Sequence, residues 1–477
     1  MHSDLQEKLQ FHDLAGRRVE CDFSGGTLSS DGGLIVLRDM DKYLRLSERL
    51  ADCFVDMRDQ RFVDHKLREL VAQRVLGLCA GYEDLNDHNS LRLDPLVAVA
   101  VGKTDPTGME RVGEENMGKA LAGASTLNRL ELGNQDGSAH YRKIKPQMQQ
   151  FEDLLVKMGV ETLDPTTVEV TLDFDATDDI VHGLQEGRFF NAYYDNYCYL
   201  PLYCFIGDVP VWAQLRQSDI DASRGTVEAL KKIVPAIRHR CPDARIIVRA
   251  DSGFCREEIM AWCEENDVLY VLGLARNSRL IGYLESTMFR ARMKACLTGG
   301  HAREFTDFEY QTRNSWSNAR RVIGKAEILP KGENPRFIVT NLPEDGFGDG
   351  QKERFTPAAC YEIIYCARGN MENRIKEQQL DLFADRTSTH YMDTNQLRLW
   401  FSTFAYFLLQ RLRTLTLSGT QLAKATAGTI RLSLLKIAAS VTVSCRRVYI
   451  RFASAFPLRE VFALVHQRIM ALPQTDG

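Results

Sequence analysis

The chain has 477 residues, 44% of them apolar and 26% charged, and its formal net charge is −4. This length exceeds what one hydrophobic core usually holds, so we expect several domains, and the bulk charge does not by itself indicate a nucleic-acid binder. The longest apolar run, "LWFSTFAYFLL", is too short to span a bilayer, and "MHSDLQEKLQ" has no signal-peptide core. We therefore expect a cytoplasmic protein with no membrane partner. The 12 cysteines include no CxxC pair, which argues against a structural zinc site.

Residues 1–40 are predicted to form a short β segment around the glycine-rich turn "FSGGTLSSDGGLIVL". Residues 41–160 are predicted to be mainly helical, because apolar residues recur at helical spacing in "DHKLRELVAQRVLGLCA". The segment "GASTLNRLELG" indicates a short capped helix that could belong to a DNA-binding unit. Such helices are common, so this signal is weak.

Residues 161–300 show a change of period. "TTVEVTLDFDATDD" alternates strictly, as a strand does, and places Asp173 and Asp175 on one face. Further strands are predicted in "NAYYDNYCYLPLYCFIG" and "VPVWAQLRQ", then a helix, the strand "ARIIVRADSG", a second helix and the strand "VLYVLGLARN". Three consecutive strands followed by alternating helices and strands predict an α/β fold with a mixed sheet flanked by helices. This is the order of a ribonuclease-H-like core.

The remaining sequence completes and extends this core. Residues 301–350 are strand-like in "EFTDFEYQT", "RRVIGKAEIL" and "RFIVTNL", which predicts a β insertion. Residues 351–385 are predicted to return to the core with a helix that carries Glu372. Residues 386–477 are predicted to be mostly helical and are basic, because the only acids between Thr387 and Thr475 are Asp393 and Glu460. A polyanionic partner and a helical domain with snorkelling basic side chains explain this composition equally well.

Three acids stand at structurally special positions. Asp175 ends the first strand of the predicted sheet, Asp251 ends the fourth, and Glu372 lies on the late helix. Ligands of open α/β sheets gather at the carboxyl ends of strands, so these acids could meet there and hold two Mg²⁺ ions for phosphoryl transfer. Alternatively, an Asp at a strand end caps a turn and a helical Glu is solvated. Asp173 is a second candidate for the first ligand, but Asp175 is preferred because it stands at the strand end.

Helical spacing places a row of polar side chains on one face of the stretch that begins at Tyr365. The row consists of Tyr365, Arg368, Glu372, Lys376 and Gln379. Charged rows of this kind usually serve only solubility. If Glu372 is a metal ligand, the row also has a functional role.

Several of these segments resemble bacterial insertion-sequence transposases of the DDE class. "LDFDATDD" and "VRADSGF" resemble the segments of the first and second aspartates, and the stretch from Tyr365 resembles the Tyr–Arg–Glu–Lys signature around the third acid. Within the class, the chain is most similar to the insertion-sequence thirteen-eighty group, through "GYEDLNDHNSLRLDPLVAVAVGK", "VHGLQEGRFFNAYYDNYCYLPLY" and "ARGNMENRIKE". The resemblance runs from about Gly25 to about Phe462.

The resemblance implies that Asp175, Asp251 and Glu372 are the catalytic metal ligands, with Mg²⁺ as the cofactor and Mn²⁺ as a substitute. It implies that Tyr365 and Arg368 help to hold the end of the transposable element. The role of the region at 41–160 in reading that end is a hypothesis that rests on position alone.

One position departs from the signature, because Gln379 stands where a Lys is expected seven residues after the Glu. Gln379 carries no charge, so Lys376, one turn earlier on the same face, is a candidate replacement as a DNA contact. In the β insertion, Trp316 is the candidate for stacking on a flipped base beside the cut. Packing of Trp316 against its own sheet is the alternative that we favour.

The function implied by the resemblance is that of a transposase. It would bind the terminal inverted repeats of an insertion sequence, cleave the DNA at the element ends and join the 3′ ends to target DNA. Its partners would be double-stranded DNA and further copies of itself, as a homodimer or a larger synaptic assembly. It would work in the bacterial cytoplasm, associated with the nucleoid when bound to DNA. Two alternatives stay open, a ribonuclease-H-like nuclease without strand transfer and a catalytically inactive DNA-binding relative.

Overall fold

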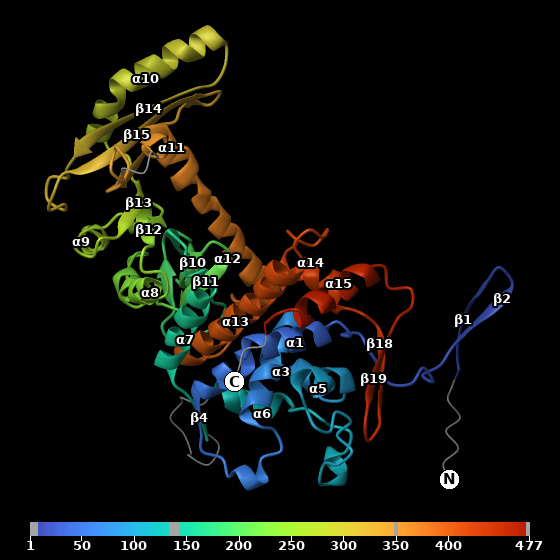
Figure 1. Cartoon of the computed structure of the whole chain (residues 1–477). Coiled ribbons are helices and arrows are strands. Elements are labelled where there is room, and N and C mark those ends of the chain that lie inside the picture. Colours follow the sequence, from blue (N-terminus) through green and yellow to red (C-terminus); the bar gives the residue numbers. More distant parts are fainter. Residues whose placement is uncertain (1–7, 133–142, 348–351, 474–477) are drawn as a thin grey trace, which may run out of the picture. The chain divides into compact units, whose positions relative to one another are not determined.

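The computed structural model describes residues 8–132, 143–347 and 352–473 (Figure 1). These residues divide into two compact units. The terminal unit contains 8–132, 143–145 and 408–473, and the central unit contains 146–347 and 352–407. Helix α13 (Met392–Thr416) contributes residues to both. The N-terminal and C-terminal regions, which the sequence pattern treats as separate, therefore share one unit.

A nine-stranded mixed sheet forms the centre of the central unit. Its order is β11 (Val209–Gln214), β10 (Leu202–Ile206), β6 (Glu169–Ala176), β12 (Arg245–Ala250), β13 (Leu269–Leu274), β17 (Arg336–Thr340), β15 (Arg320–Leu329) and β14 (Ala302–Tyr310). The short strand β16 (Gly332–Glu333) pairs with β15. Strands β6, β12 and β13 are parallel to one another, and the other pairs are antiparallel. The prediction of a mixed sheet flanked by helices is confirmed.

The strands of the β insertion continue this sheet. β17 pairs with β13 through Val271 and Thr340, and β15 and β14 follow outward. The structure also corrects the prediction of a single strand at 191–207. It contributes β8 (Phe189–Asn191) and β9 (Asn196–Tyr199) to a small sheet with β7 (Asp179–Ile180), and only its last part forms β10.

Alternation along the strands gives the sheet two apolar faces. On one face, Leu172, Phe174 and Val248 belong to a core cluster with buried residues of the surrounding helices. Those helices are α7 (Met148–Glu161), α8 (Thr226–Arg240), α9 (Glu257–Glu265) and α10 (Ser278–Thr298). On the other face, Ile247 and Val271 belong to a second cluster with residues of the segment before Glu372. Asp173, Asp175 and Asp251 alternate with the first cluster, so the strand period directs their side chains to the second face.

The segment that carries the Tyr365 row is wound unevenly. It begins with α11 (Pro357–Ala359), continues as a π-helical turn (Cys360–Tyr365) and a 3₁₀ turn (Cys366–Arg368), and becomes regular in α12 (Gly369–Leu382). Cys360, Tyr361 and Ile364 pack on the second face of the sheet. The predicted continuous helix is therefore correct for Glu372 onward but not for Tyr365 and Arg368.

The terminal unit combines helices with short strands. Its helices are α1 (Leu34–Leu44), α2 (Leu46–Asp52), α3 (Leu67–Ala80), α4 (His88–Leu91), α5 (Pro95–Val101), α6 (Ala124–Glu131), α14 (Ala427–Ile430) and α15 (Arg459–Met470). Its strands are β1 (Leu9–Leu14), β2 (Arg17–Cys21), β3 (Leu28–Ser29), β4 (Phe54–Asp56), β5 (Ile144–Pro146), β18 (Ala439–Val443) and β19 (Val448–Phe452). Helix α1 thus begins within the predicted β segment, and a β hairpin lies in the region predicted as mostly helical.

Close backbone contact joins the two ends of the chain within the terminal unit. The Gly33 amide donates to the Leu435 carbonyl at 2.9 Å, and the Gly32 amide donates to the Ile437 carbonyl at 2.8 Å. A Cβ on Gly33 would lie 2.1 Å from the Leu434 oxygen, so this position requires glycine. In the part of the chain described here, no helix has both the length and the apolar character needed to cross a membrane.

Candidate active site

Asp175 and Asp251 lie at the same edge of the sheet. β6 and β12 are parallel neighbours, and Arg249 is registered opposite Asp173. Two residues further along each strand stand Asp251 and Asp175, so the register brings these two acids side by side. Asp251 also caps the 3₁₀ turn Ser252–Phe254, because its Oδ1 accepts from the Gly253 amide at 2.8 Å.

Asp173, the alternative to Asp175, has a partner of its own. Its carboxylate accepts two hydrogen bonds from the Arg249 guanidinium, with Nη2 to Oδ2 at 2.7 Å. The Asp173 side chain is buried, and that of Arg249 is 11% exposed. Arg249 also donates to the Ile364 carbonyl and so ties the sheet to the π-helical turn. Arg249 thus engages both carboxylate oxygens of Asp173, whereas Asp175 stands at the strand end and accepts one bond from Arg368.

Arg368 connects the sheet edge to Glu372. Its Nη1 donates to Asp175 Oδ2 at 3.2 Å, and its Nη2 donates to Glu372 Oε1 at 2.8 Å. The side chains of Arg368 and Asp175 are 18% and 13% exposed, whereas that of Glu372 is 46% exposed. One guanidinium therefore joins the first and third acids, and the latter remains open to solvent.

Electrostatics marks Asp175 as an unusual carboxyl group. Burial raises the pKa of Asp175 to about 7, and the nearby negative charges of Asp251 and Glu372 act in the same direction, while Arg368 opposes them. Burial lowers the pKa of Arg368, but the surrounding acids raise it more, so the pKa lies above its ordinary value. Perturbed carboxyl groups of this kind are frequent at catalytic and metal-binding sites.

The Tyr365 hydroxyl and the turn after Asp251 both lie over Gly273 of strand β13. A Cβ on Gly273 would lie 2.6 Å from the Tyr365 hydroxyl and 2.7 Å from the Ser252 amide nitrogen, so the ring and the turn after Asp251 fill the space above this glycine. Burial raises the pKa of the Tyr365 hydroxyl, and the charge of Asp251 adds to that shift. The Tyr365 hydroxyl therefore lies close to the turn that follows Asp251.

The last two residues of the row do not contact the acids. Gln379 Nε2 donates to the Asp178 carbonyl at 3.3 Å. Lys376 is exposed. The sequence places both on the face of Glu372, but only Arg368 among the basic residues of the row contacts the acids.

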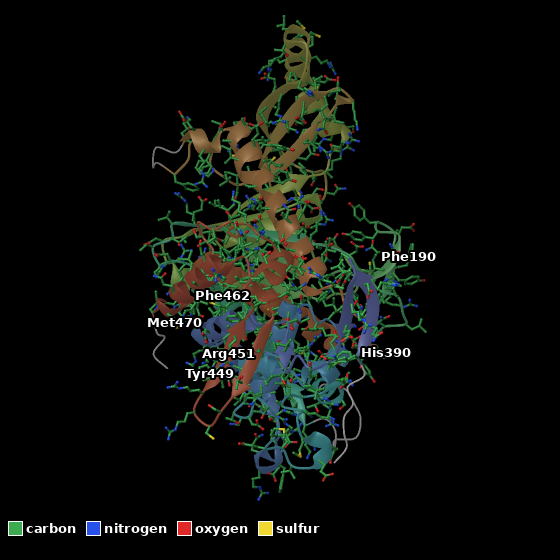
Figure 2. All side chains as sticks on the ribbon, turned by 90° about the vertical axis from the view of Figure 1, so that its right-hand side faces the viewer. Phe190, His390, Tyr449, Arg451, Phe462 and Met470 are labelled. Carbon is green, nitrogen blue, oxygen red and sulfur yellow. The ribbon has the colours of Figure 1, made fainter. Side chains whose placement is uncertain are left out.

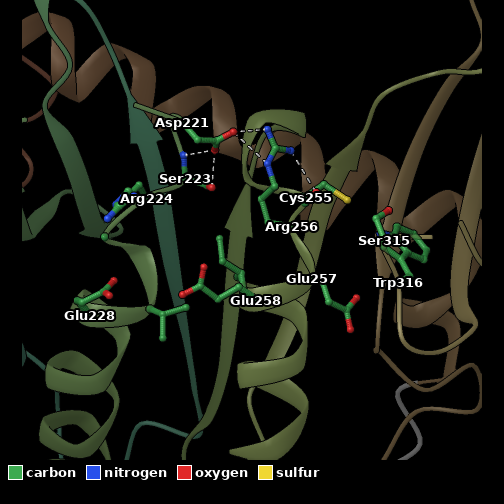
Figure 3. A pocket seen from close by; sticks show the side chains of 13 residues that line it. Asp221, Ser223, Arg224, Glu228, Cys255, Arg256, Glu257, Glu258, Ser315 and Trp316 are labelled. Atoms are coloured by element: carbon green, nitrogen blue, oxygen red, sulfur yellow. Dashed lines mark hydrogen bonds and ion pairs between the residues drawn. The ribbon is translucent and has the colours of Figure 1, made fainter. Parts of the chain in front are cut away.

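Trp316 lines a cavity of about 780 Å³ together with residues of the segments 221–228 and 255–259 (Figure 3). Only 7% of Trp316 is exposed, its ring meets Tyr310 edge-on at 5.7 Å, and the Arg320 guanidinium lies 5.5 Å from its centre. Arg256 in the same cavity is paired with Asp221 at 2.7 Å. These contacts are those of a tryptophan packed within its own unit, and base stacking stays a prediction.

Comparison with known protein families decides the class of this chain. A family model described as Transposase DDE domain group 1 matches residues 11–474, nearly the whole chain. The chain belongs to this transposase family. A search of curated proteins found no match. Family membership places the chain among nuclease and transferase enzymes that act on DNA.

The acids of this transposase suit divalent cations in chemistry, but they are not arranged as a finished metal site. Among the described residues, no three His, Cys, Asp or Glu side chains lie close enough together to hold a metal ion. Carboxylate oxygens are the ligands that Mg²⁺ prefers. Burial is the main cause of the raised Asp175 pKa, and the negative charges of Asp251 and Glu372 add to it; a cation would relieve that added repulsion. The Arg368 guanidinium supplies positive charge between Asp175 and Glu372.

Sequence reasoning did not identify Arg249 or Gly273 in this transposase. Arg249 stands two residues before Asp251, as Asp173 stands two residues before Asp175, and this equal spacing is a signal for a paired position on parallel strands. No sequence pattern indicates that Tyr365 requires a glycine on β13, because the contact joins residues 92 positions apart.

Proposed function

We propose that this protein is a DDE transposase that binds the terminal inverted repeats of an insertion sequence, cleaves the DNA at the element ends and joins the 3′ ends to target DNA. The observation that carries the proposal is the placement of Asp175 and Asp251 at the ends of adjacent parallel strands, with Glu372 linked to Asp175 through Arg368. The strand order β11-β10-β6-β12-β13 supports a ribonuclease-H-like core for this unit.

Asp175, Asp251 and Glu372 would hold Mg²⁺ or Mn²⁺. These ions, when bound, activate the attacking water or 3′-hydroxyl and stabilise the leaving oxygen. Arg368 lies where it can neutralise a phosphate once it leaves the carboxylates, and Tyr365 fixes the turn of Asp251 against β13. Because displacement at phosphorus needs little covalent help from a protein, positioning and charge are what these side chains contribute.

Two features of the wider chain support a DNA substrate and several copies of the protein. No acid occurs between Asp393 and Glu460, so the C-terminal region can approach phosphates without repulsion. Joining two element ends to one target requires both ends to be held together, so we propose a homodimer or a larger synaptic assembly. We assign the insertion-sequence thirteen-eighty group on the three long segments that resemble it.

The test is a cleavage assay on a labelled duplex that contains the element end and its flank. We expect a nick at the element boundary with Mg²⁺ or Mn²⁺ and none with EDTA. Cleavage should be abolished, with DNA binding retained, in the variants Asp175→Asn, Asp251→Asn and Glu372→Gln. The control is Asp393→Asn on α13, which should cleave as the wild type does. Full cleavage by any of the first three variants removes that residue from the site.

A second assay separates the transposase from a plain nuclease. Pre-cut ends are incubated with a supercoiled plasmid, and we expect joined products in which the 3′ ends are linked to plasmid DNA. Cleavage without joining would identify a nuclease, and end binding without metal-dependent cleavage would identify an inactive relative.

A further inference from the structure

Strands β18 and β19 form a two-stranded ribbon in the terminal unit (Figure 1). Its base is anchored, because β3 pairs with Ala439 and Ser440, and Phe452 packs edge-on against Phe462 of α15 at 5.1 Å. Beyond Ser440, the two strands pair only with each other among the described residues. The tip at 444–447 is fully exposed. We call β18, this tip and β19 the basic ribbon.

One face of the basic ribbon carries an ordered set of polar side chains. Thr442 is registered opposite Tyr449, and Arg451 lies on the same face. Arg451 Nη1 donates to Thr442 Oγ1 at 3.1 Å, and its guanidinium lies 5.3 Å from the centre of the Tyr449 ring. Arg447 Nη1 donates to the Tyr449 hydroxyl at 2.9 Å. Figure 2 shows Tyr449 and Arg451 next to each other on the ribbon. Two guanidinium groups are thus held in place with N–H groups left over for a ligand.

The positive charge of the basic ribbon is not compensated. In the described ranges, no carboxylate pairs with Arg446, Arg447 or Arg451. Exposed arginines elsewhere in the same unit do have such partners, as Arg61 has in Asp59 at 2.7 Å and Arg45 has in Glu48 at 2.9 Å. An exposed cluster of unpaired guanidiniums with an aromatic ring among them suits a polyanion with hydrogen-bond acceptors.

The dimensions of the basic ribbon suit double-stranded DNA. The major groove of B-DNA is about 12 Å wide and about 8.5 Å deep and admits a two-stranded β ribbon. Three residues of β18 lie beyond the anchored Ala439 and Ser440, so the free strands extend about 10 Å before the tip. The exposed part of the ribbon is therefore long enough to enter the groove while Arg446 and Arg447 at the tip reach base edges and Arg451 reaches the phosphates.

We propose that the basic ribbon is a DNA-binding element that enters a groove of the duplex substrate. The inference rests on the proposed function, which supplies duplex DNA as the partner, and it adds a binding site that is separate from the acids. Arg446, Arg447 and Arg451 contact phosphates and base edges, and Tyr449 positions the two flanking guanidiniums.

The first test is fluorescence anisotropy of a labelled element-end duplex at salt concentrations from about 50 to about 300 mM, over which the screening of charges changes strongly. The variant replaces Arg446, Arg447 and Arg451 by Ala. We expect its affinity at low salt to fall on the order of 10-fold per arginine, and the slope of log K against log salt to flatten by about 0.9 for each phosphate that is no longer neutralised. Arg292→Ala is the control, because this exposed arginine of α10 in the central unit pairs with Glu333 at 2.6 Å; it should bind as the wild type does.

Two further variants separate charge from geometry. Replacement of the three arginines by Lys keeps the charge, so the salt slope should persist while discrimination between the end duplex and a shuffled duplex declines. Tyr449→Phe keeps the ring and removes the hydroxyl that accepts from Arg447, so a smaller loss of affinity is expected. Because all these side chains are exposed, far-UV circular dichroism should be unchanged.

The second test places a photo-crosslinker on Cys445 at the ribbon tip. The other exposed cysteines, Cys21, Cys296 and Cys366, are first replaced by Ser. We expect crosslinks to bases within the end duplex. Crosslinks to a second copy of the protein instead, or wild-type affinity and slope in the arginine variant, would overturn the inference.

The outcomes also distinguish this inference from the proposed function. If metal-dependent cleavage by the acids is observed and the arginine variant binds normally, only the ribbon assignment fails. If the wild-type protein binds no duplex DNA at all, the proposed function fails and the ribbon assignment fails with it.

Discussion

Gly273 gives the sharpest test of how the second aspartate is held. Its backbone conformation is ordinary for a strand, so only space opposes a side chain there. An alanine Cβ would lie 2.6 Å from the Tyr365 hydroxyl, 2.7 Å from the Ser252 nitrogen and 3.0 Å from the Asp251 carbonyl carbon. Contacts below 3.4 Å force the neighbours to move, so about 0.7–0.8 Å must be gained here. Two of the three atoms belong to the backbone of Asp251 and Ser252.

Two effects of Gly273→Ala follow from that displacement. Overpacking of this size should destabilise the central unit by about 1–3 kcal/mol. A shift of Asp251 approaching 1 Å should reduce the rate of end cleavage on the order of 100-fold. All four tryptophans lie in the central unit, so urea unfolding followed by tryptophan fluorescence reports its stability alone. Cleavage of the labelled end duplex reports the rate.

Controls for Gly273→Ala come from the same unit. Gly282 in α10 has no atom within 4 Å of an added Cβ, so Gly282→Ala should leave cleavage unchanged and stabilise the helix by up to about 1 kcal/mol. The double variant Gly273→Ala, Tyr365→Phe removes the nearest contact and should recover part of the lost stability. Wild-type unfolding and wild-type cleavage in Gly273→Ala would refute the proposed packing of Tyr365 against Asp251.

Three other predictions concern charge. The pKa of Asp175 is about 7, against an ordinary value of 3.8. The protonated carboxyl therefore stabilises the folded state below pH 4, and this contribution is lost as the pH rises through 7. Asp175→Asn should remove that pH-dependent loss, which is up to about 4 kcal/mol, as measured by urea unfolding in EDTA. Burial lowers the pKa of His88 from 6.5 to about 3. The neutral ring therefore contributes to stability above pH 6.5, and this contribution is lost as the pH falls toward 3. His88→Phe should reduce the fall in melting temperature between pH 6.5 and pH 3, as measured by circular dichroism. Gln379→Lys adds one charge beside Asp178 and should steepen the salt slope of end binding by about 0.9, whereas an unchanged slope would show that position 379 does not face DNA.

The sequence alone predicts that Asp175 and Asp251 stand at the ends of strands, because the pattern that marks a strand end is local. The alternation of apolar and polar residues predicts the strand around Phe174, and the polar residues from Asp251 onward predict where β12 ends. The same period places Asp173 beside Asp175 and cannot separate them, because their difference lies in Arg249 on the neighbouring strand. Pairing across a sheet depends on register, which a single strand does not encode.

Other parts of the site depend on contacts between distant residues. A helical period cannot distinguish the π-helical and 3₁₀ turns before Gly369 from regular α-helix, because all three place residues three to five apart on one side. The link from Arg368 to Asp175 spans 193 residues. The union of the terminal regions likewise depends on backbone contacts such as Gly33 with Leu435, which no local pattern predicts.

That union has a consequence for how the protein is made on the ribosome. The nascent chain delivers the first residues of the terminal unit early, but Leu435 and α15, which complete that unit, emerge only after the whole central unit. Domains generally fold as they are synthesised, so the central unit can fold before the C-terminal part of the terminal unit has been made. Helix α1 can pack early against α2, α3 and α5, but the part of its surface that contacts α15 stays exposed during that interval. A premature stop near residue 407 would release a protein with a complete acid site and an unfinished terminal unit.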